Sequence, residues 1–569
     1  MKRILYMVCG LALLATTATA QKSAYSVGGL HLMNDAMTTG DLVNLSQQQF
    51  NFGTARSMGM AGAFTSLGAD QASMVINPAG LGMYRRGEVT ITPLVTISNA
   101  TTPGTNDFQS NSKSRFAMGN IGGVFNVHEG SGNLLSFNIG FGYNRLADFN
   151  YNYSFSTVPR RGATSIADAM SVMLEVGRVG INGSGAIEQN GFANWGVDPM
   201  FWPGVAAYKT YLVDMNENGV WYPAEIGANA TIEQGTSVRS RGSAGEFSIA
   251  MGGNINNKLY FGFTLGIQSI YQKQNIYYGE AYSYGGGNGY DSGDMAVDSD
   301  GVLLNKVMQQ MGMEQRVRLD GSGVNFKLGV IYRPIPSLRL GFAFHTPTFY
   351  SIERRYEMAM STVSLGETSP TDQTTHEYTS DTVSEILEDD GPNTWEFTSP
   401  ARMMFGASYT LGSFAVLSVD YERAWYNSIR VKNMPYLPYG PGESDFKQDF
   451  KNYFKGSNNL RVGLEVRPIP MMAVRAGYGY SSSSLKEQET VVSHPVTNET
   501  NYVTAGLGFN LGRKCFLDVA YCYSQSSTSD YMLYYGNVYG FGSEEIYESD
   551  RFTTDFDRHN IALTFGVRF

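Results

Sequence analysis

The sequence is poor in cysteine, in charge and in long apolar runs. Only 3 of its 569 residues are cysteine, and charged residues make up 16% of the chain. Beyond the first twenty residues there is no run of about 18 uncharged apolar residues, which excludes a transmembrane helix. The net charge of −10, without any basic run, argues against nucleic-acid partners.

The scarce reactive residues do not form a catalytic pattern. Cys515 and Cys522 lie seven residues apart in one expected strand, so they face opposite sides about 23 Å apart and cannot form an intrachain disulfide. The 6 histidines are scattered without metal-ligand spacing, and no Ser/His/Asp set is visible. We therefore expect no enzymatic activity and no required cofactor.

Glycine, aromatic residues and strict alternation are abundant instead. The last eleven residues show this best, because Ile561, Leu563 and Phe565 alternate with Ala562 and Thr564. A strand has a side-chain period of two, so one face is a continuous apolar stripe and the other is small or polar. This pattern is typical of a transmembrane strand.

Alternating segments recur fourteen times, separated in turn by short turns and long loops. An even number of strands with that rhythm is typical of single-chain bacterial barrels, whose short turns are periplasmic and whose long loops are extracellular. We expect an all-β, 14-stranded antiparallel transmembrane β-barrel of the bacterial outer membrane, with strands at 88–98, 114–127, 133–147, 244–254, 258–272, 317–332, 338–352, 401–410, 414–427, 458–467, 471–483, 501–511, 514–527 and 559–569.

The alternation also assigns a facing to each charge. A charge on the lipid face near the midplane costs about 2–4 kcal/mol, so charged residues in the strands must face inward. The expected lumen charges are Lys327, Arg339, Arg402, Asp420, Glu422, Arg461, Glu465 and Arg475.

The N-terminal part divides into two segments. Residues 1–20 have the basic start, apolar run and small-residue cleavage site of a secretory signal peptide. Residues 21–87 show no alternation and many small residues, and they predict an N-terminal extension and a helical hatch that plugs the lumen. The barrel then occupies residues 88–569.

Two motifs in residues 52–82 carry a family resemblance. The glycine- and alanine-rich segment Phe52–Asp70, followed by Asn77-Pro78-Ala79, resembles the hatch of the long-chain fatty-acid and hydrocarbon transporters of the outer membrane (FadL/TodX/OMPP1-like). Segments 399–409 and 460–468 are similar as well. The resemblance implies passive uptake of hydrophobic compounds. It further implies that the loops capture the ligand and that a periplasmic hatch gates its passage. The ligand would then leave sideways into the membrane at a kinked third strand.

The same resemblance sets expectations for partners. These are hydrophobic small molecules, outer-membrane lipids and, through the C-terminal strand, the barrel assembly machinery; we expect a monomer. In the third strand, Gly140 and Gly142 are the candidates for the kink of a lateral gate, since glycine inside a strand often marks a bend. The alternative is that both glycines only fit a crowded lumen.

One extracellular loop matches a calcium-binding pattern. Oxygen ligands are spaced as in the D-x-N-x-N-G-x5-E motif, which predicts a structural Ca²⁺ held by Asp214, Asn216, Asn218, Val220 and Glu225. The alternative is ordinary loop chemistry, since Asn, Asp and Gly are common in turns.

A second function is compatible with the sequence. The long loops could serve a surface receptor, in one version for haem with His345 of the lumen as a ligand. A lipase or protease barrel is the third alternative, and it lacks the Ser/His/Asp set that such an enzyme needs.

Overall fold

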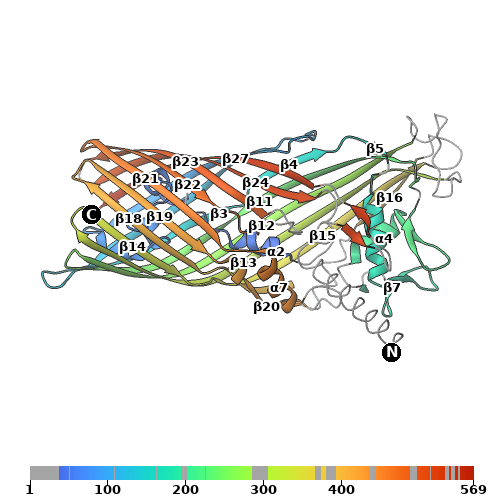
Figure 1. Ribbon diagram of the computed structural model, residues 1–569, viewed down its shortest axis with the longest axis horizontal. Helices are drawn as coiled ribbons and strands as arrows, with labels where there is room; N and C mark the ends of the chain where they lie inside the picture. Colours follow the sequence, from blue (N-terminus) through green and yellow to red (C-terminus); the bar gives the residue numbers. More distant parts are fainter. Residues whose placement is uncertain are drawn as a thin grey trace, which may run out of the picture.

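A computed structural model gives the architecture of most of the chain (Figure 1). None of the helices in the described part is long and apolar enough to cross a bilayer. The described residues are 37–49, 52–107, 109–161, 163–193, 196–197, 201–224, 226–284, 306–365, 373–379, 393–435, 442–486, 496–512, 514–531, 537–539, 545–548 and 551–569. The expected signal peptide, residues 1–20, lies outside them.

The described residues form a barrel of fourteen antiparallel wall strands, which closes where the first strand pairs with the last. Each strand pairs with its sequence neighbours in the wall, so the all-β barrel expected from the sequence is confirmed. The wall strands are β1 (Glu88–Thr101), β2 (Ser112–Glu129), β3 (Leu134–Asp148), β11 (Thr231–Ile255), β12 (Leu259–Ser283), β13 (Val307–Ile335), β14 (Leu338–His345), β18 (Arg402–Leu411), β19 (Ala415–Ala424), β21 (Ser457–Ile469), β22 (Met472–Ser481), β23 (Val496–Leu511), β24 (Cys515–Tyr531) and β27 (Arg551–Arg568).

Six further strands continue the same sheet beyond the wall strands. One end of the barrel carries only short turns and the other carries the long loops; we call them the turn end and the loop end (Figure 1). The continuing strands are β4 (Tyr151–Ser156), β5 (Arg160–Arg161), β15 (Phe349–Leu365), β16 (Gln373–Thr379), β17 (Asn393–Thr398) and β20 (Arg430–Asn433).

Several strands are longer than the sequence predicted. β11, β13 and β27 begin at Thr231, Val307 and Arg551, well before the expected 244, 317 and 559. The added segments invert the lipid-facing pattern, because Met311 and Met313 of β13 point inward and are buried. The outward apolar pattern therefore ends where the wall leaves the bilayer, although the strands continue.

The seventh expected strand, 338–352, is broken. β14 ends at His345 and β15 begins at Phe349, with Pro347 between them. Proline has no N–H for the ladder, so it is tolerated only at such an interruption. The neighbouring strand breaks at the same level. There the Ser399 amide donates to the Thr348 carbonyl, and the Thr348 amide donates to Ser399 Oγ, both at 2.9 Å.

An exposed apolar belt surrounds the turn-end half of the barrel. Its outward side chains are 37–70% exposed, whereas their inward neighbours are buried. Representative belt residues on four adjacent strands are Phe247, Ile267, Val324 and Phe349, which are register partners. The belt is the surface that a bilayer covers.

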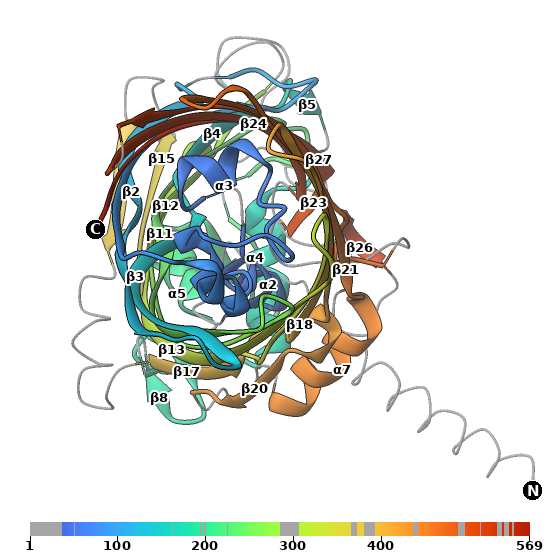
Figure 2. The ribbon, with the colours of Figure 1, turned by 90° about the vertical axis from the view of Figure 1, so that its left-hand side faces the viewer.

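The N-terminal hatch lies inside the ring of strands (Figure 2). Thr54, Asp70 and Asn77 cap its helical turns through their side-chain oxygens, which satisfies amides that would otherwise be buried without a partner. Its elements are α2 (Thr39–Ser46), α3 (Ala55–Gly59), η1 (Gln71–Met74) and η2 (Pro78–Met83).

The loop end carries a small module of short helices and hairpins. Glu280 of β12 fixes its first helix, because the Glu280 carboxylate accepts hydrogen bonds from Ser165 Oγ at 2.6 Å and from the Ile166 amide at 2.9 Å. The elements of the loop end are α4 (Ile166–Val176), β6 (Gly180–Ile181), β7 (Ile187–Gln189), β8 (Phe192–Ala193), α5 (Trp202–Lys209), β9 (Val213–Met215), β10 (Trp221–Pro223), η5 (Tyr426–Ser428), α7 (Glu443–Tyr453), β25 (Asn537–Tyr539) and β26 (Glu545–Glu548).

We predict that Gly329→Val displaces the hatch. A Cβ at position 329 would clash with Asn77 Oδ1 and lie 3.0 Å from Pro78 Cδ, and the Asn77 side chain cannot move away without losing its hydrogen bonds to Thr65 and Ala79. Overpacking of this kind costs at least about 1–3 kcal/mol. The variant should acquire stepwise ion conductance in planar bilayers and rapid proteolysis within residues 52–84, while keeping the heat-modifiable gel mobility of a folded barrel.

Gly132→Ala is the matched control, because a Cβ at that position meets nothing within 4 Å. A Gly329→Val barrel that conducts no more than wild type and resists protease equally would show that the hatch does not depend on this contact.

Candidate functional site

The hatch is held in the lumen by side chains of the barrel wall. Hatch carbonyl oxygens accept hydrogen bonds from inward wall donors on strands all around the ring. These bonds join Thr264 Oγ1 to Met74 O at 2.9 Å, Asn138 Nδ2 to Leu81 O at 2.8 Å, Tyr502 OH to Ala61 O at 3.1 Å, Thr504 Oγ1 to Gly59 O at 3.1 Å and His345 Nε2 to Ile76 O at 2.9 Å.

The Asn77-Pro78-Ala79 motif lies at the centre of this contact. The Asn77 amide donates to Thr65 O at 2.6 Å, and its Oδ1 accepts from the Ala79 N–H at 3.1 Å. The side chain thus ties two hatch segments together and caps η2. Pro78 presses against the wall so closely that a Cβ at Gly262 would lie 2.2 Å from its carbonyl carbon.

Glu465 holds the turn-end side of the hatch. Its carboxylate accepts from Arg56 of the hatch at 3.1 Å, from Arg475 at 2.8 Å and from Arg467 at 2.8 Å. Arg475 also bonds Asp518 at 2.6 Å. Glu465, Arg475 and Asp518 are buried and mutually paired, as buried charges must be.

A second charge cluster lies on the loop-end side. Glu422 accepts from Arg402 at 2.7 Å and from Arg461 at 2.6 Å, while Arg402 also donates to the carbonyl of Ser46 at the end of α2. Asp420 accepts from the amide of Thr65 at 2.7 Å.

The two remaining expected lumen charges also face inward. Lys327 is buried and forms an ion pair with Glu246, which the sequence reading did not single out. Gln268 and Asn325 complete the hydrogen bonds of that carboxylate. Arg339 is half-buried at the turn end.

Burial and charged partners shift the pKa values of two ionisable groups of the hatch. Burial lowers the pKa of Arg56, but Glu465 and Asp70 outweigh burial and raise it above its ordinary value. Burial raises the pKa of Asp70, which Arg56 and hydrogen bonds from Ala72 and Thr54 partly offset. Arg56 therefore stays charged at the centre of its cluster.

A cavity of about 190 Å³ lies above the hatch. Gln47 and Gln49 at the end of α2 border it on the hatch side. Hydroxyl and amide side chains of β21 to β24, such as Ser524, line one side, and aromatic rings line the other. Those rings stack along β4 at 6.2–6.3 Å and meet Phe556 of β27 edge-on. The lining also includes the charged residues Asp41, Asp148, Arg402, Arg461 and Arg558.

The wall is not continuous beside this cavity. Pairing between β2 and β3 ends at Asn120 and Asn144, so residues 112–118 of β2 pair only with β1. Residues 144–150 are all buried, and a bulge at Leu146 interrupts the pairing of the third strand with β11. The Leu146 carbonyl accepts a hydrogen bond from the amide of Gln49 at 2.8 Å. The cavity reaches the wall at residues 147–149, just beyond the end of the pairing with β2.

Gly140 and Gly142, the predicted kink residues, lie in the regular part of the third strand. They pair in register with Val124 and Gly122 of β2. A Cβ at Gly140 would lie 3.1 Å from Met74 Sδ of the hatch. These glycines make room for the hatch, and the break lies a few residues further on.

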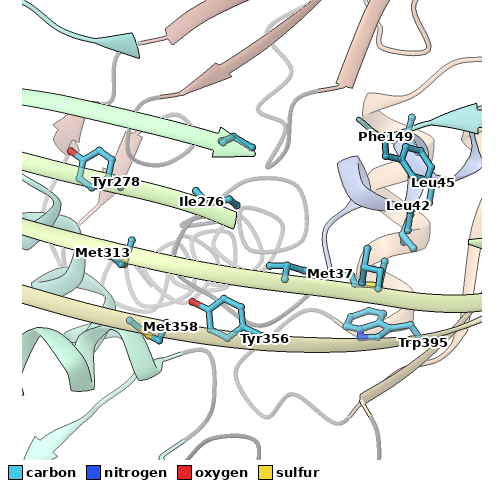
Figure 3. Close-up of a cluster of buried hydrophobic side chains, with 14 of the residues drawn as sticks. Met37, Leu42, Leu45, Phe149, Ile276, Tyr278, Met313, Tyr356, Met358 and Trp395 are labelled. Atoms are coloured by element: carbon cyan, nitrogen blue, oxygen red, sulfur yellow. The ribbon is translucent and has the colours of Figure 1, made fainter. Parts of the chain in front are cut away.

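The loop-end half of the lumen is apolar. Figure 3 shows Ile276, Tyr278, Met313, Tyr356 and Met358 on the inner faces of adjacent strands. Further along the same cluster, Phe149 lies beside Leu42 and Leu45 of the hatch helix α2. Methionine and aromatic side chains give an adaptable apolar lining. This cluster leads from the loop-end module toward the cavity.

On the turn-end side of the hatch the lumen is charged. A second cavity of about 560 Å³ is lined by charged residues that include Arg56, Asp70, Arg85 and Glu88. An apolar solute entering it would strip water from these groups without replacing their hydrogen bonds, which is costly. This cavity is a poor route for an apolar solute.

The expected calcium loop is described only in part. Asp214 and Asn216 lie in or beside a hairpin of β9 and β10, and Asn216 Oδ1 accepts from the amides of Asn218 and Val220 at 3.0 Å. Glu225 lies outside the described residues. Among the described residues no three acidic, histidine or cysteine side chains gather as a metal site. The calcium site stays a prediction.

His345 is part of the hatch contact. Because Nε2 faces the carbonyl of Ile76 at 2.9 Å, it must carry the proton and donate. Binding of a haem iron at Nε2 would break this hatch contact, so this arrangement gives the haem alternative no support.

We predict that Glu465→Gln lowers the free energy of unfolding by about 3–5 kcal/mol, since it leaves buried guanidinium groups without their shared carboxylate. Guanidinium unfolding in detergent micelles measures this. Arg467→Gln removes a partner whose side chain is 51% exposed and should cost less than about 1 kcal/mol. Equal losses in both variants would contradict a buried cluster that holds the hatch.

The chain is similar to outer-membrane proteins of known structure. Among solved structures, the chain is similar to a Pseudomonas aeruginosa FadL homologue (11% identity, 92% of this chain and 100% of that chain, TM-score 0.47) and to the Ralstonia pickettii toluene transporter TbuX (14%, 92% and 99%, TM-score 0.44). No curated protein matches. The family model described as outer membrane protein transport protein (OMPP1/FadL/TodX) matches residues 243–569, more than half of the chain. The chain therefore belongs to the OMPP1/FadL/TodX family of outer-membrane transport proteins.

Proposed function

We propose that this protein takes up hydrophobic small molecules passively, long-chain fatty acids or similar lipophilic compounds, and releases them sideways into the outer membrane. The observation that carries the proposal is that the cavity above the hatch reaches the wall at residues 147–149, just beyond Asn144, where the pairing of the third strand with β2 ends. No covalent chemistry is required.

The orientation follows from the connections. Short turns of outer-membrane barrels face the periplasm and long loops face outside. We therefore place the hatch toward the periplasm and the apolar loop-end lumen toward the medium. A lipophilic solute would be captured among the methionine and aromatic side chains, where burying its surface is favourable by about 25 cal/mol per Å².

The cavity above the hatch has room for a small apolar group beside its aromatic side chains. Its volume of about 190 Å³ exceeds the ~150 Å³ of an engineered apolar cavity that binds benzene. Two similar structures are named a toluene transporter and a monoaromatic hydrocarbon channel. An aromatic hydrocarbon and the end of an acyl chain are both of suitable size.

The two ways out of the cavity differ in cost. The axial route passes the Glu465 and Glu422 clusters, whose charges are paired across the hatch and would have to be separated in a poorly hydrated space. Separating a buried pair costs several kcal/mol. The lateral route passes residues 112–118 and 145–150, whose edge has no ladder hydrogen bonds to break.

We predict that closing the lateral route stops uptake. If the β2–β3 ladder continued, Met118 would lie opposite Leu146, so Met118→Cys with Leu146→Cys places thiols on the two sides of the break. Joining them with a short bis-maleimide should lower uptake of a labelled fatty acid or of toluene into proteoliposomes by at least about tenfold. The untreated variant should transport normally.

The matched control is Ile121→Cys with Tyr143→Cys, which are register partners just beside the break. Joining this pair should leave uptake unchanged. Unimpaired uptake after complete cross-linking at 118 and 146, checked by mass spectrometry, would contradict lateral release.

A further inference from the structure

A row of cations crosses the outer face of the barrel beyond the apolar belt. On four adjacent strands, Arg241 pairs in register with Lys273, Lys273 with Arg318, and Arg318 with Arg355. All four alternate outward, and Arg239 adds a fifth outward cation beside them. We call these five residues the cation row.

Such an arrangement is unfavourable by itself, because like charges directly opposite each other across strands are destabilising. Arg318 and Arg355 find partial relief in Asp320 and Glu353 on their own strands, at 2.5 and 2.7 Å. Arg239, Arg241 and Lys273 form no ion pair with any carboxylate of the described residues. A concentrated positive charge remains on this flank.

The far flank of the outer rim carries acidic side chains instead. On the far flank, β23 and β27 present Glu499, Asp555 and Asp557 outward, and the chain as a whole carries a net charge of −10. The cation row is therefore a local segregation of charge in an acidic protein.

Its distance from the belt points to its ligand. Four of the five cations lie six residues beyond the belt residues Phe247, Ile267, Val324 and Phe349 of their own strands, and Arg239 lies eight residues beyond Phe247. Six residues span about 20 Å along a strand, or about 15 Å along the membrane normal at the usual tilt. The headgroup layer of an ordinary bilayer extends only about 5–8 Å beyond the hydrocarbon.

We propose that the cation row binds the phosphate groups of a phosphorylated glycolipid in the outer leaflet. A sugar headgroup carries phosphates further from the hydrocarbon than a phospholipid does, and so reaches the level of the row. Guanidinium groups bind phosphate oxygens in pairs with good geometry. This binding site is separate from the proposed transport function and goes beyond it.

The site adjoins the break in the wall. Arg239 pairs in register with Asn152 of β4, and Lys113 of β2 reaches across the break to the carbonyl of Ser240 at 2.6 Å and to Asn152 Oδ1 at 3.2 Å. A glycolipid held by the row would therefore lie beside the unpaired edge of β2.

Binding of defined lipids to the full-length detergent-solubilised barrel tests the proposal, with bound molecules counted by native mass spectrometry. The probes are a phosphorylated bacterial glycolipid, the same glycolipid after enzymatic dephosphorylation, phosphatidylglycerol and inorganic phosphate. We expect the phosphorylated glycolipid to bind at least about tenfold more tightly than each of the others, with an affinity that falls as salt is raised.

The variant Arg239→Gln, Arg241→Gln, Lys273→Gln removes three cations without stranding a carboxylate among the described residues. It should weaken glycolipid binding by at least about tenfold. The control Lys432→Gln, Lys447→Gln, Lys451→Gln removes the same charge from exposed positions elsewhere on the rim and should bind as wild type does.

Three outcomes overturn the proposal. Equal binding of the dephosphorylated lipid would show that phosphate is not recognised. Phosphatidylglycerol or inorganic phosphate binding as tightly as the glycolipid would identify a phospholipid or a free anion as the ligand. Equal losses in the two triple variants would reduce the effect to net charge. Since no uptake is measured, none of these outcomes bears on the transport function.

Discussion

The structure depends on one constraint: the irregular backbone of the hatch is buried in the lumen and must find hydrogen-bond partners there. The wall supplies them from its inward side chains, as Thr264 does for Met74 and Asn138 for Leu81. An unpaired buried carbonyl would cost about 1–3 kcal/mol. The polar lumen is thus the complement of the hatch as well as the usual inner face of a barrel, and its glycines mark where the two backbones come closest.

That constraint divides the lumen into two functional parts. Around the hatch, charges such as Glu465 and Glu422 are paired and buried, which makes the axial path expensive for an apolar solute. Beyond it, toward the loops, the inner face is apolar (Figure 3). Between the two parts, the third strand leaves its neighbour at Asn144, where the cavity reaches the wall. The proposed transport, in which a solute is captured among the loops, held above the hatch and released sideways, is consistent with this order of surfaces.

The sequence predicts the barrel well because bilayer and lumen impose opposite chemistry on alternate residues. The placement of Glu422 and Arg461 on the inner face follows from that rule. The rule fails beyond the membrane, where apolar residues such as Met311 and Met313 face inward, so the pattern predicts β11, β13 and β27 too short. Glu246 carries no local signal, because its role depends on Lys327, a partner distant in sequence. Gly140 and Gly142 were recognised as unusual, but only the packing of Met74 explains them.

The central claim is that the hatch stays bound to the wall while solute passes beside it. Hydrogen–deuterium exchange of residues 52–84, in proteoliposomes with and without a saturating hydrophobic substrate, tests this most directly. The account predicts that these amides remain as protected as those of the wall strands under both conditions. Exchange of the hatch that becomes complete within minutes when substrate is added, while the wall strands stay protected, would contradict it.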